Sequence, residues 1–361
     1  MSATKLSAPE KTVPPRPLTS SLGGKTLPAL FPPVLLVGVA LVAAGLLYLT
    51  GGWNPALWAI ATALGYTVVV TVASALVENG RKAKDRLVTA VVYICFGIAM
   101  VPLVSLLWTV LSAGLVRLDG YFLTVSMNGV TPSMDAGGAY HAILGTLLMT
   151  LMAALISVPI GLMTAIYLVE YGKGRLKRAI TFFVDVMTGI PSIVAGLFVV
   201  ALWILLFGPG KTNGAAGAIS LSVLMIPVVV RSCEEMLRLV PNELREASYA
   251  LGVPKWLTVV KVVLPTAIAG ITTGVMLALA RVIGETAPLI LTAGSSAVAI
   301  NANLFEGQMM SLPVFIYSQV RMGGAINYER AWAGALTLII IVMLLFLAAR
   351  LVSRFFAPKT R

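Results

Sequence analysis

The sequence predicts an all-α polytopic membrane protein with about eight transmembrane helices. Of its 361 residues, 58% are hydrophobic and only 11% are charged, and the mean hydropathy is +0.95. Soluble domains are nearer about 45–50% apolar, so the excess points to lipid. The net charge of +12 would suit nucleic acid, but the basic residues form short clusters between long apolar runs, which is typical of membrane proteins.

The long apolar runs define the predicted organisation. Residues 1–27 are rich in Pro, Ser and Lys and lack an apolar run, which predicts a disordered cytoplasmic tail. A charged linker separates the first two spans from the others, so residues 28–86 are expected to form an added hairpin and linker before a six-helix core, residues 87–361. The predicted spans are residues 28–49, 55–77, 87–111, 142–169, 179–207, 215–237, 267–290 and 331–351.

The Lys and Arg residues predict which side of the membrane each loop occupies, because cytoplasmic loops carry an excess of them. Most of the 26 basic residues fall on one side, and that side includes both ends of the chain. Both termini are therefore predicted to be cytoplasmic, in agreement with an even number of spans. The basic segments are residues 1–27, 78–86, 170–178, 231–261 and 350–361, and opposite them lie Arg117, Lys211, Arg321 and Arg330.

Between the sixth and seventh spans, residues 241–251 have the pattern of a short amphipathic helix. Leu244, Ala247 and Leu251 fall on one face at helical spacing, and Asn242 is a candidate N-cap. Gly252 can adopt the left-handed conformation that ends a helix. Spacing alone leaves open a helix that simply lies on the membrane surface.

The same segment resembles the EAA loop of the permeases of ATP-driven (ABC) importers. The match rests on Glu246, Ala247, Gly252 and residues 264–265, with Ser248 in place of the second Ala of the family pattern. In that family the short helix docks into a groove on a cytoplasmic ATPase, a mode that needs such anchors. The resemblance therefore implies that Glu246, Ala247 and Gly252 couple the chain to an ATPase.

The seventh span contains two charged side chains, Arg281 and Glu285, which are costly in lipid and usually face a polar interior. Their spacing of four residues would place them on one helix face, where they can pair. Gly284 and Pro288 weaken the helix and are candidate hinges, and Thr286 can satisfy freed backbone groups. Two interpretations stay open: an ion pair that locks the bundle, or a cation that meets an anion in transit while Glu285 holds or releases it.

The fifth span contains Pro191, which is expected to kink the helix. Gly189 and Gly196 would let neighbouring helices approach closely. This pattern fits tight packing alone, and it also fits a hinge beside a transport pathway to which Ser192 is exposed.

Residues 281–288 resemble a stretch of the phosphate permeases within the ABC importer family. Residues 165–172, 189–198 and 311–314 are similar to other stretches of those permeases. The resemblance begins at about residue 87 and leaves out the first two spans, whose role it does not define. It implies that the chain carries inorganic phosphate, with Arg281, Glu285, Thr286 and Ser192 along the substrate pathway.

The resemblance also implies partners: a second, homologous permease subunit, two copies of a cytoplasmic ATPase and an extracytoplasmic phosphate-binding protein. ATP and Mg²⁺ would bind to the ATPase, so no cofactor, metal or catalytic residue is expected on this chain. Residues 208–212 mimic the end of a P-loop, but the required first Gly would fall at Leu205. The rival functions are an ABC permease for another anion, a transporter driven by an ion gradient, and a membrane scaffold that transports nothing.

Overall fold

The computed structural model describes residues 26–296 and 300–356, and within them the chain forms helices and no strands. Seven of these described helices are long and apolar enough to cross a membrane, or up to eight segments if a bent pair counts as one span. The predicted all-α polytopic fold is therefore confirmed. The predicted tail, residues 1–27, lies almost wholly outside the described residues.

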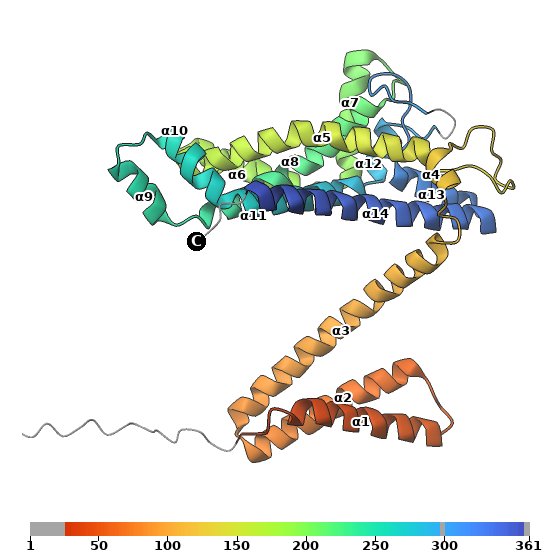
Figure 1. Ribbon diagram of the computed structural model, residues 1–361, viewed down its shortest axis with the longest axis vertical. Helices are drawn as coiled ribbons and strands as arrows, with labels where there is room; N and C mark the ends of the chain where they lie inside the picture. Colours follow the sequence, from red (N-terminus) through yellow and green to blue (C-terminus); the bar gives the residue numbers. More distant parts are fainter. Residues whose placement is uncertain (1–25, 297–299, 357–361) are drawn as a thin grey trace, which may run out of the picture. The chain divides into compact units, whose positions relative to one another are not determined.

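The chain divides into two compact units, and the first ends at Ser105. In it, α1 (Phe31–Leu49) and α2 (Pro55–Val77) lie side by side as a hairpin (Figure 1). The Asn54 side chain caps α2 by accepting hydrogen bonds from two backbone N–H groups of its first turn. The division between the units falls within α3 (Gly80–Gly114), and the start of the core at residue 87 stays a prediction.

The second unit, from Leu106 onward, is built around four long helices: α5 (Tyr140–Ile166), α8 (Gly214–Arg238), α11 (Leu264–Ile283) and α14 (Ala325–Phe356). α8 packs against both α5 and α11, and α11 packs against α14 (Figure 1). α8 therefore lies at the centre of the bundle, and most of its residues are buried.

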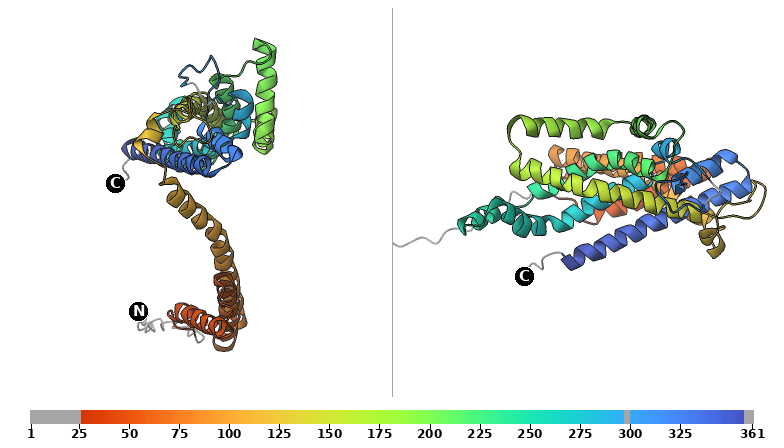
Figure 2. Two further views of the ribbon diagram at one scale, coloured as in Figure 1. Left: turned by 90° about the vertical axis from the view of Figure 1, so that its right-hand side faces the viewer. Right: turned by 90° about the horizontal axis from the view of Figure 1, so that it is seen from above.

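The predicted fifth span is two helices, α6 (Gly174–Gly189) and α7 (Ser192–Phe207), which meet at 107° (Figure 2). The expected kink at Pro191 is thus a full break of the helix. Ile190 is extended, with φ −70° and ψ 128°, which is the conformation that a residue before proline prefers. The chain therefore leaves helical geometry before Pro191, and a new helix starts after it.

The predicted seventh span is also interrupted. α11 ends at Ile283, and a short helix, α12 (Ala287–Thr292), starts after Gly284 and Thr286. At its other end the helix extends beyond the prediction, because α10 (Lys255–Thr258) and the π-helix η2 (Val259–Val263) run into α11 as one segment of 29 residues.

The two ends of the bundle carry different short helices. α9 (Asn242–Ala250) and α10 lie at one end, and α4 (Gly120–Thr124) and α13 (Leu312–Met322) lie at the other (Figure 1). A second π-helix, η1 (Tyr167–Tyr171), ends α5. α14 runs from the α13 end back to the end that carries α9 (Figure 1).

Candidate functional site

The structure confirms the predicted short helix at α9 and the way it ends. Gly252 has a φ of +75°, the left-handed conformation, and its N–H donates to the Tyr249 carbonyl at 2.9 Å. The N–H of Val253 donates to the Ser248 carbonyl at 3.2 Å, so two carbonyls at the helix end are satisfied. A side chain would strain the backbone at Gly252, which accounts for glycine at this position.

The predicted N-cap of this helix is wrong. Pro241 occupies the N-cap position, and Asn242 is already the first helical residue. The Asn242 Oδ1 atom accepts instead from Nη1 of Arg245 at 3.3 Å. The fixed φ of Pro241, −59°, sets the entry to the helix without a side-chain cap.

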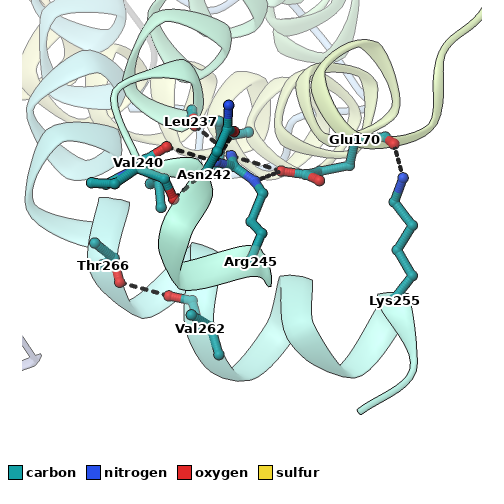
Figure 3. A network of polar contacts seen from close by, with 9 residues as sticks. Glu170, Leu237, Val240, Asn242, Arg245, Lys255, Val262 and Thr266 are labelled. Atoms are coloured by element: carbon teal, nitrogen blue, oxygen red, sulfur yellow. Dashed lines mark hydrogen bonds and ion pairs between the residues drawn. The ribbon is translucent and has the colours of Figure 1, made fainter. Parts of the chain in front are cut away.

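Arg245 is the anchor that holds α9 against the bundle (Figure 3). Its Nε and Nη2 atoms each lie 2.9 Å from Oε1 of Glu170 in η1, and the two side chains are 12% and 5% exposed. Its Nη1 donates to the Val240 carbonyl at 2.6 Å, and its Nη2 donates to the Leu237 carbonyl at 3.0 Å. One guanidinium therefore satisfies the carbonyls where α8 ends and links α9 to η1.

Two further contacts fix α10 beside this anchor. The Lys255 ammonium donates to the backbone carbonyl of Glu170 (Figure 3). It also lies 5.0 Å from the ring centroid of Tyr171. The hydroxyls of Ser248 and Thr258, both buried, are 2.9 Å apart and join α9 to α10. Sequence reasoning missed Glu170 as a site residue and used Arg245 and Lys255 only to orient the chain.

The opposite side of α9 is exposed. Glu246, Ala247 and Gly252, the predicted coupling residues, are all exposed. Beside them Leu251 is 83% exposed and Trp256 is 61% exposed. An anchored helix that presents apolar side chains and a carboxylate to the outside is suited to docking in a groove of a partner.

The four predicted pathway residues lie at the starts or ends of the broken spans. Arg281 is exposed, and Glu285, Thr286 and Ser192 are half-buried. Across residues 26–296 and 300–356, the Arg281 and Glu285 side chains form no ion pair with each other. Of the two interpretations left open by the sequence, the internal ion pair is not seen among these residues, because α11 ends between Arg281 and Glu285 and their spacing of four residues no longer places them on one helix face.

Thr286 occupies the N-cap position of α12, but its side chain makes no capping hydrogen bond, contrary to expectation. Only the backbone carbonyl of Thr286 takes part in the helix, where it accepts a hydrogen bond from the N–H of Ile290 at 3.1 Å. The Thr286 hydroxyl therefore remains available to another group.

The broken spans meet where α7 packs against α12. A Cβ atom on Gly196 would lie 2.8 Å from Cα of Pro288, which is buried, so the predicted close approach at Gly196 is confirmed. The same expectation for Gly189 is wrong, because a Cβ there would meet nothing within 4 Å. Pro191, Gly284 and Pro288 all stand at the breaks, and their role as hinges stays a prediction.

The contact between α7 and α12 gives a direct test. Gly196→Ala should lower the stability of the folded protein by about 1–3 kcal/mol, because the added methyl group meets backbone rather than a flexible side chain. Gly189→Ala, the matched control, should leave stability unchanged or slightly raised. Thermal unfolding of the purified full chain in detergent measures both, and equal melting temperatures would contradict the close packing.

Residues 157–361 match the family described as the binding-protein-dependent transport system inner membrane component. The chain belongs to this family. The matched region includes α9, both broken spans and all the candidate site residues. As an inner membrane component of binding-protein-dependent transport, the chain is a permease subunit that crosses the membrane several times.

Individual members of this family are similar to the chain over most of its length. The phosphate transport system permease protein PstA 1 of Mycobacterium tuberculosis is 50% identical over 283 residues, which cover 78% of this chain and 92% of that protein. The PstA protein of Pasteurella multocida is 36% identical over 282 residues, which cover 78% of this chain and 97% of that protein.

A solved structure shows the same fold at low identity. A chain in the crystal structure of a bacterial alginate ABC transporter, in complex with an alginate pentasaccharide-bound periplasmic protein, is 15% identical. The TM-score is 0.53, and the match covers 77% of this chain and 96% of that one. This likeness concerns the fold of this permease family alone.

Proposed function

We propose that this chain is the permease subunit of an ATP-driven importer that moves inorganic phosphate across the cytoplasmic membrane. The observation that carries the proposal is the 50% identity over 283 residues with a phosphate permease. The matched region covers 92% of the length of that permease. The chain itself performs no catalysis in this proposal. ATP and Mg²⁺ bind to a separate ATPase, and the permease carries no cofactor.

Arg281 is the proposed contact for phosphate in transit. An exposed guanidinium on a membrane span, without an ion pair among the described side chains, needs a counter-charge or water from outside the chain. Its planar fork of N–H donors suits phosphate oxygens. Glu285, Thr286 and Ser192 line the same pathway in this proposal, and Glu285 helps to release the anion by competing for Arg281.

The exposed face of α9 supports the proposed contact with an ATPase. Glu246, Ala247 and Gly252 would enter the groove of that partner, with two ATPase copies serving this chain and a second, homologous permease. The phosphate-binding protein would approach the other end of the bundle, at α4 and α13. With α9 facing the cytoplasm, the C-terminal end of α14 also lies inside, which supports a cytoplasmic location for the end of this helix. The cytoplasmic location of the N-terminus stays a prediction from the basic segments of the sequence.

Reversing the charge at the docking surface tests the ATPase contact. Glu246→Lys should weaken association with the ATPase while the protein still inserts into the membrane, because the side chain is exposed and forms no ion pair among the described residues. Co-purification of the ATPase with tagged permease measures this. Glu306→Lys is the control, because Glu306 is also exposed but lies in the segment between α12 and α13, away from α9. Unchanged co-purification of the ATPase with the Glu246 variant would contradict the proposed role.

Uptake of labelled anions by vesicles tests the function as a whole. Vesicles that contain the permease pair and the ATPase should take up phosphate, but not sulfate, when ATP and the phosphate-binding protein are supplied. Equal transport of sulfate would favour a permease for another anion. Phosphate uptake without the ATPase would favour a transporter driven by an ion gradient, and no uptake at all would favour a scaffold.

A further inference from the structure

The first unit contains two neighbouring cavities along the crevice between α2 and α3. One has a volume of about 550 Å³ and lies where α2 ends and α3 begins, and it is the more polar of the two because its lining includes Glu78, Lys82, Asp85 and Arg86. The other has a volume of about 470 Å³, lies further along the same two helices, and is lined entirely by apolar residues. A crevice with charged residues at one end and apolar residues beyond them suits an amphiphilic ligand, with a polar head and an apolar tail.

The residues that line the two cavities form continuous stripes on both helices. On α2 the spacing of three or four residues runs without interruption from the apolar cavity into the polar one, and the same holds on α3. The two cavities are therefore successive parts of one crevice. The stripe residues are Ala59, Ala63, Tyr66 and Val70 on α2, and Val101, Gly97, Tyr93, Thr89 and Arg86 on α3.

Glu78, at the polar end, is fully engaged inside the protein. Its carboxylate accepts from Arg86 Nε at 2.8 Å, from the Ser74 hydroxyl at 2.6 Å and from the backbone N–H of Leu27 at 3.0 Å. The Arg86 guanidinium, with help from the other two donors, holds the pKa of Glu78 well below its usual range. Glu78 and Arg86 thus neutralise each other and are not available to a ligand.

Two other charged side chains that line the polar cavity remain accessible. Lys82 is 45% exposed, and its ammonium reaches Glu78 only at 3.8 Å, outside hydrogen-bond distance. Asp85 is exposed and makes no ion pair within the described chain. The two residues lie three positions apart on α3, so their Cβ atoms are about 5–6 Å from each other. The cavity therefore offers one cation and one anion, side by side.

We propose that this crevice binds one phospholipid whose headgroup carries a primary amine. The phosphate lies at Lys82, the ammonium lies at Asp85, and an acyl chain enters the apolar cavity. Small side chains at Ala59, Ala63 and Gly97 leave the width that the acyl chain occupies. Given the orientation proposed above, the headgroup lies in the cytoplasmic leaflet.

The balanced charges distinguish this ligand from others. A headgroup without an amine, such as that of phosphatidylglycerol, would bring no cation for Asp85, and the quaternary amine of phosphatidylcholine cannot donate a hydrogen bond to it. Free inorganic phosphate would leave the apolar cavity empty. A transmembrane helix of a partner protein would fill the groove but would not need the Lys82 and Asp85 charges.

Native mass spectrometry of the detergent-purified full-length protein tests the proposal, with phosphatidylethanolamine, phosphatidylcholine and phosphatidylglycerol added separately. The wild type should retain one phosphatidylethanolamine in preference to the other two lipids. Lys82→Gln should bind it about five-fold more weakly, the effect of one basic residue near a lipid phosphate. Asp85→Asn should lose the preference for phosphatidylethanolamine over phosphatidylglycerol.

Gly97→Leu tests the apolar part of the crevice. A Cβ at Gly97 meets nothing within 4 Å, so the variant can fold, while its side chain occupies the acyl position and should abolish retention of all three lipids. Gly45→Leu on α1, where a Cβ also meets nothing within 4 Å, is the control. Lys84→Gln, an exposed residue of the same helix turn that does not line the cavity, is the control for Lys82.

Several results would overturn the proposal. Equal retention of the three lipids by the wild type would show that the headgroup charges select nothing. Equal effects of Lys82→Gln and Lys84→Gln would reduce the site to a diffuse basic surface. Displacement of the lipid by millimolar inorganic phosphate would assign the polar cavity to the free anion. If Gly97→Leu lost a co-purifying membrane protein but kept the lipid, the crevice would be assigned to that protein partner.

Discussion

Phosphate uptake should fall by about 10- to 100-fold when Arg281 is replaced by Gln, because hydrogen bonds to a charged group contribute about 1.5–3 kcal/mol. Gln keeps a polar side chain of similar length but loses the charge and the planar fork that meets phosphate oxygens. Arg281 has no ion pair among the described side chains, so its replacement leaves no buried partner unpaired and the protein should still fold. Initial rates of uptake in vesicles with saturating ATP measure the effect.

Arg350→Gln is the matched control for this experiment, since Arg350 is also an exposed arginine on a long helix but lies outside the proposed pathway. Its uptake should equal that of the wild type. Normal uptake by the Arg281 variant would remove Arg281 from the pathway. A large fall in melting temperature with Arg281→Gln would show instead that Arg281 locks the bundle through a partner outside this chain.

Loss of the Glu170 carboxylate should uncouple ATP hydrolysis from transport. Glu170→Ala leaves the Arg245 guanidinium, which is 12% exposed, without its counter-charge, and the loss of one partner costs up to about 3–5 kcal/mol in buried pairs. α9 would then no longer be held firmly against η1 and the end of α8. Docking of the ATPase on the outer face of α9 should survive, so ATP hydrolysis should continue while the phosphate moved per ATP falls.

The ratio of phosphate transported to ATP hydrolysed measures this uncoupling in reconstituted complexes. Glu235→Ala is the control, because Glu235 is exposed on α8, near the same end of the bundle, and forms no ion pair within the described chain. A proportional fall in both activities would mean that Glu170 serves assembly only. An unchanged ratio and unchanged stability would remove the Arg245–Glu170 contact from the coupling route.

Features with local signals were predicted well from the sequence. The helix that became α9 was predicted because helical spacing and Gly252 both act within one or two turns. The membrane spans followed from apolar runs of sufficient length. The family resemblance added the assignment of this helix, which spacing alone had left between a docking element and a surface helix.

Features that depend on distant contacts were missed. Arg245 and Glu170 are 75 positions apart, so no periodicity in the sequence brings them together. Pro191 indicated where the fifth span deviates from a helix, but the 107° bend depends on how α7 packs against α12. The pairing of Arg281 with Glu285 assumed a continuous helix, although Gly284 between them already weakened that assumption.

The two π-helices next to α9 allow the helices that they adjoin, α5 and α11, to rotate about their own axes. η1 contains Glu170, the partner of Arg245, and η2 contacts α9 directly. A π-turn holds one residue more than an α-turn, and one residue corresponds to about 100° of rotation and about 1.5 Å of travel along the axis. If either π-helix changed to α-helical geometry, the adjoining helix would rotate by about 100° and shift by about 1.5 Å along its axis, and its backbone hydrogen bonds would form again in the new register. A displacement of α9 would then rotate α5 or α11 about its own axis instead of tilting it.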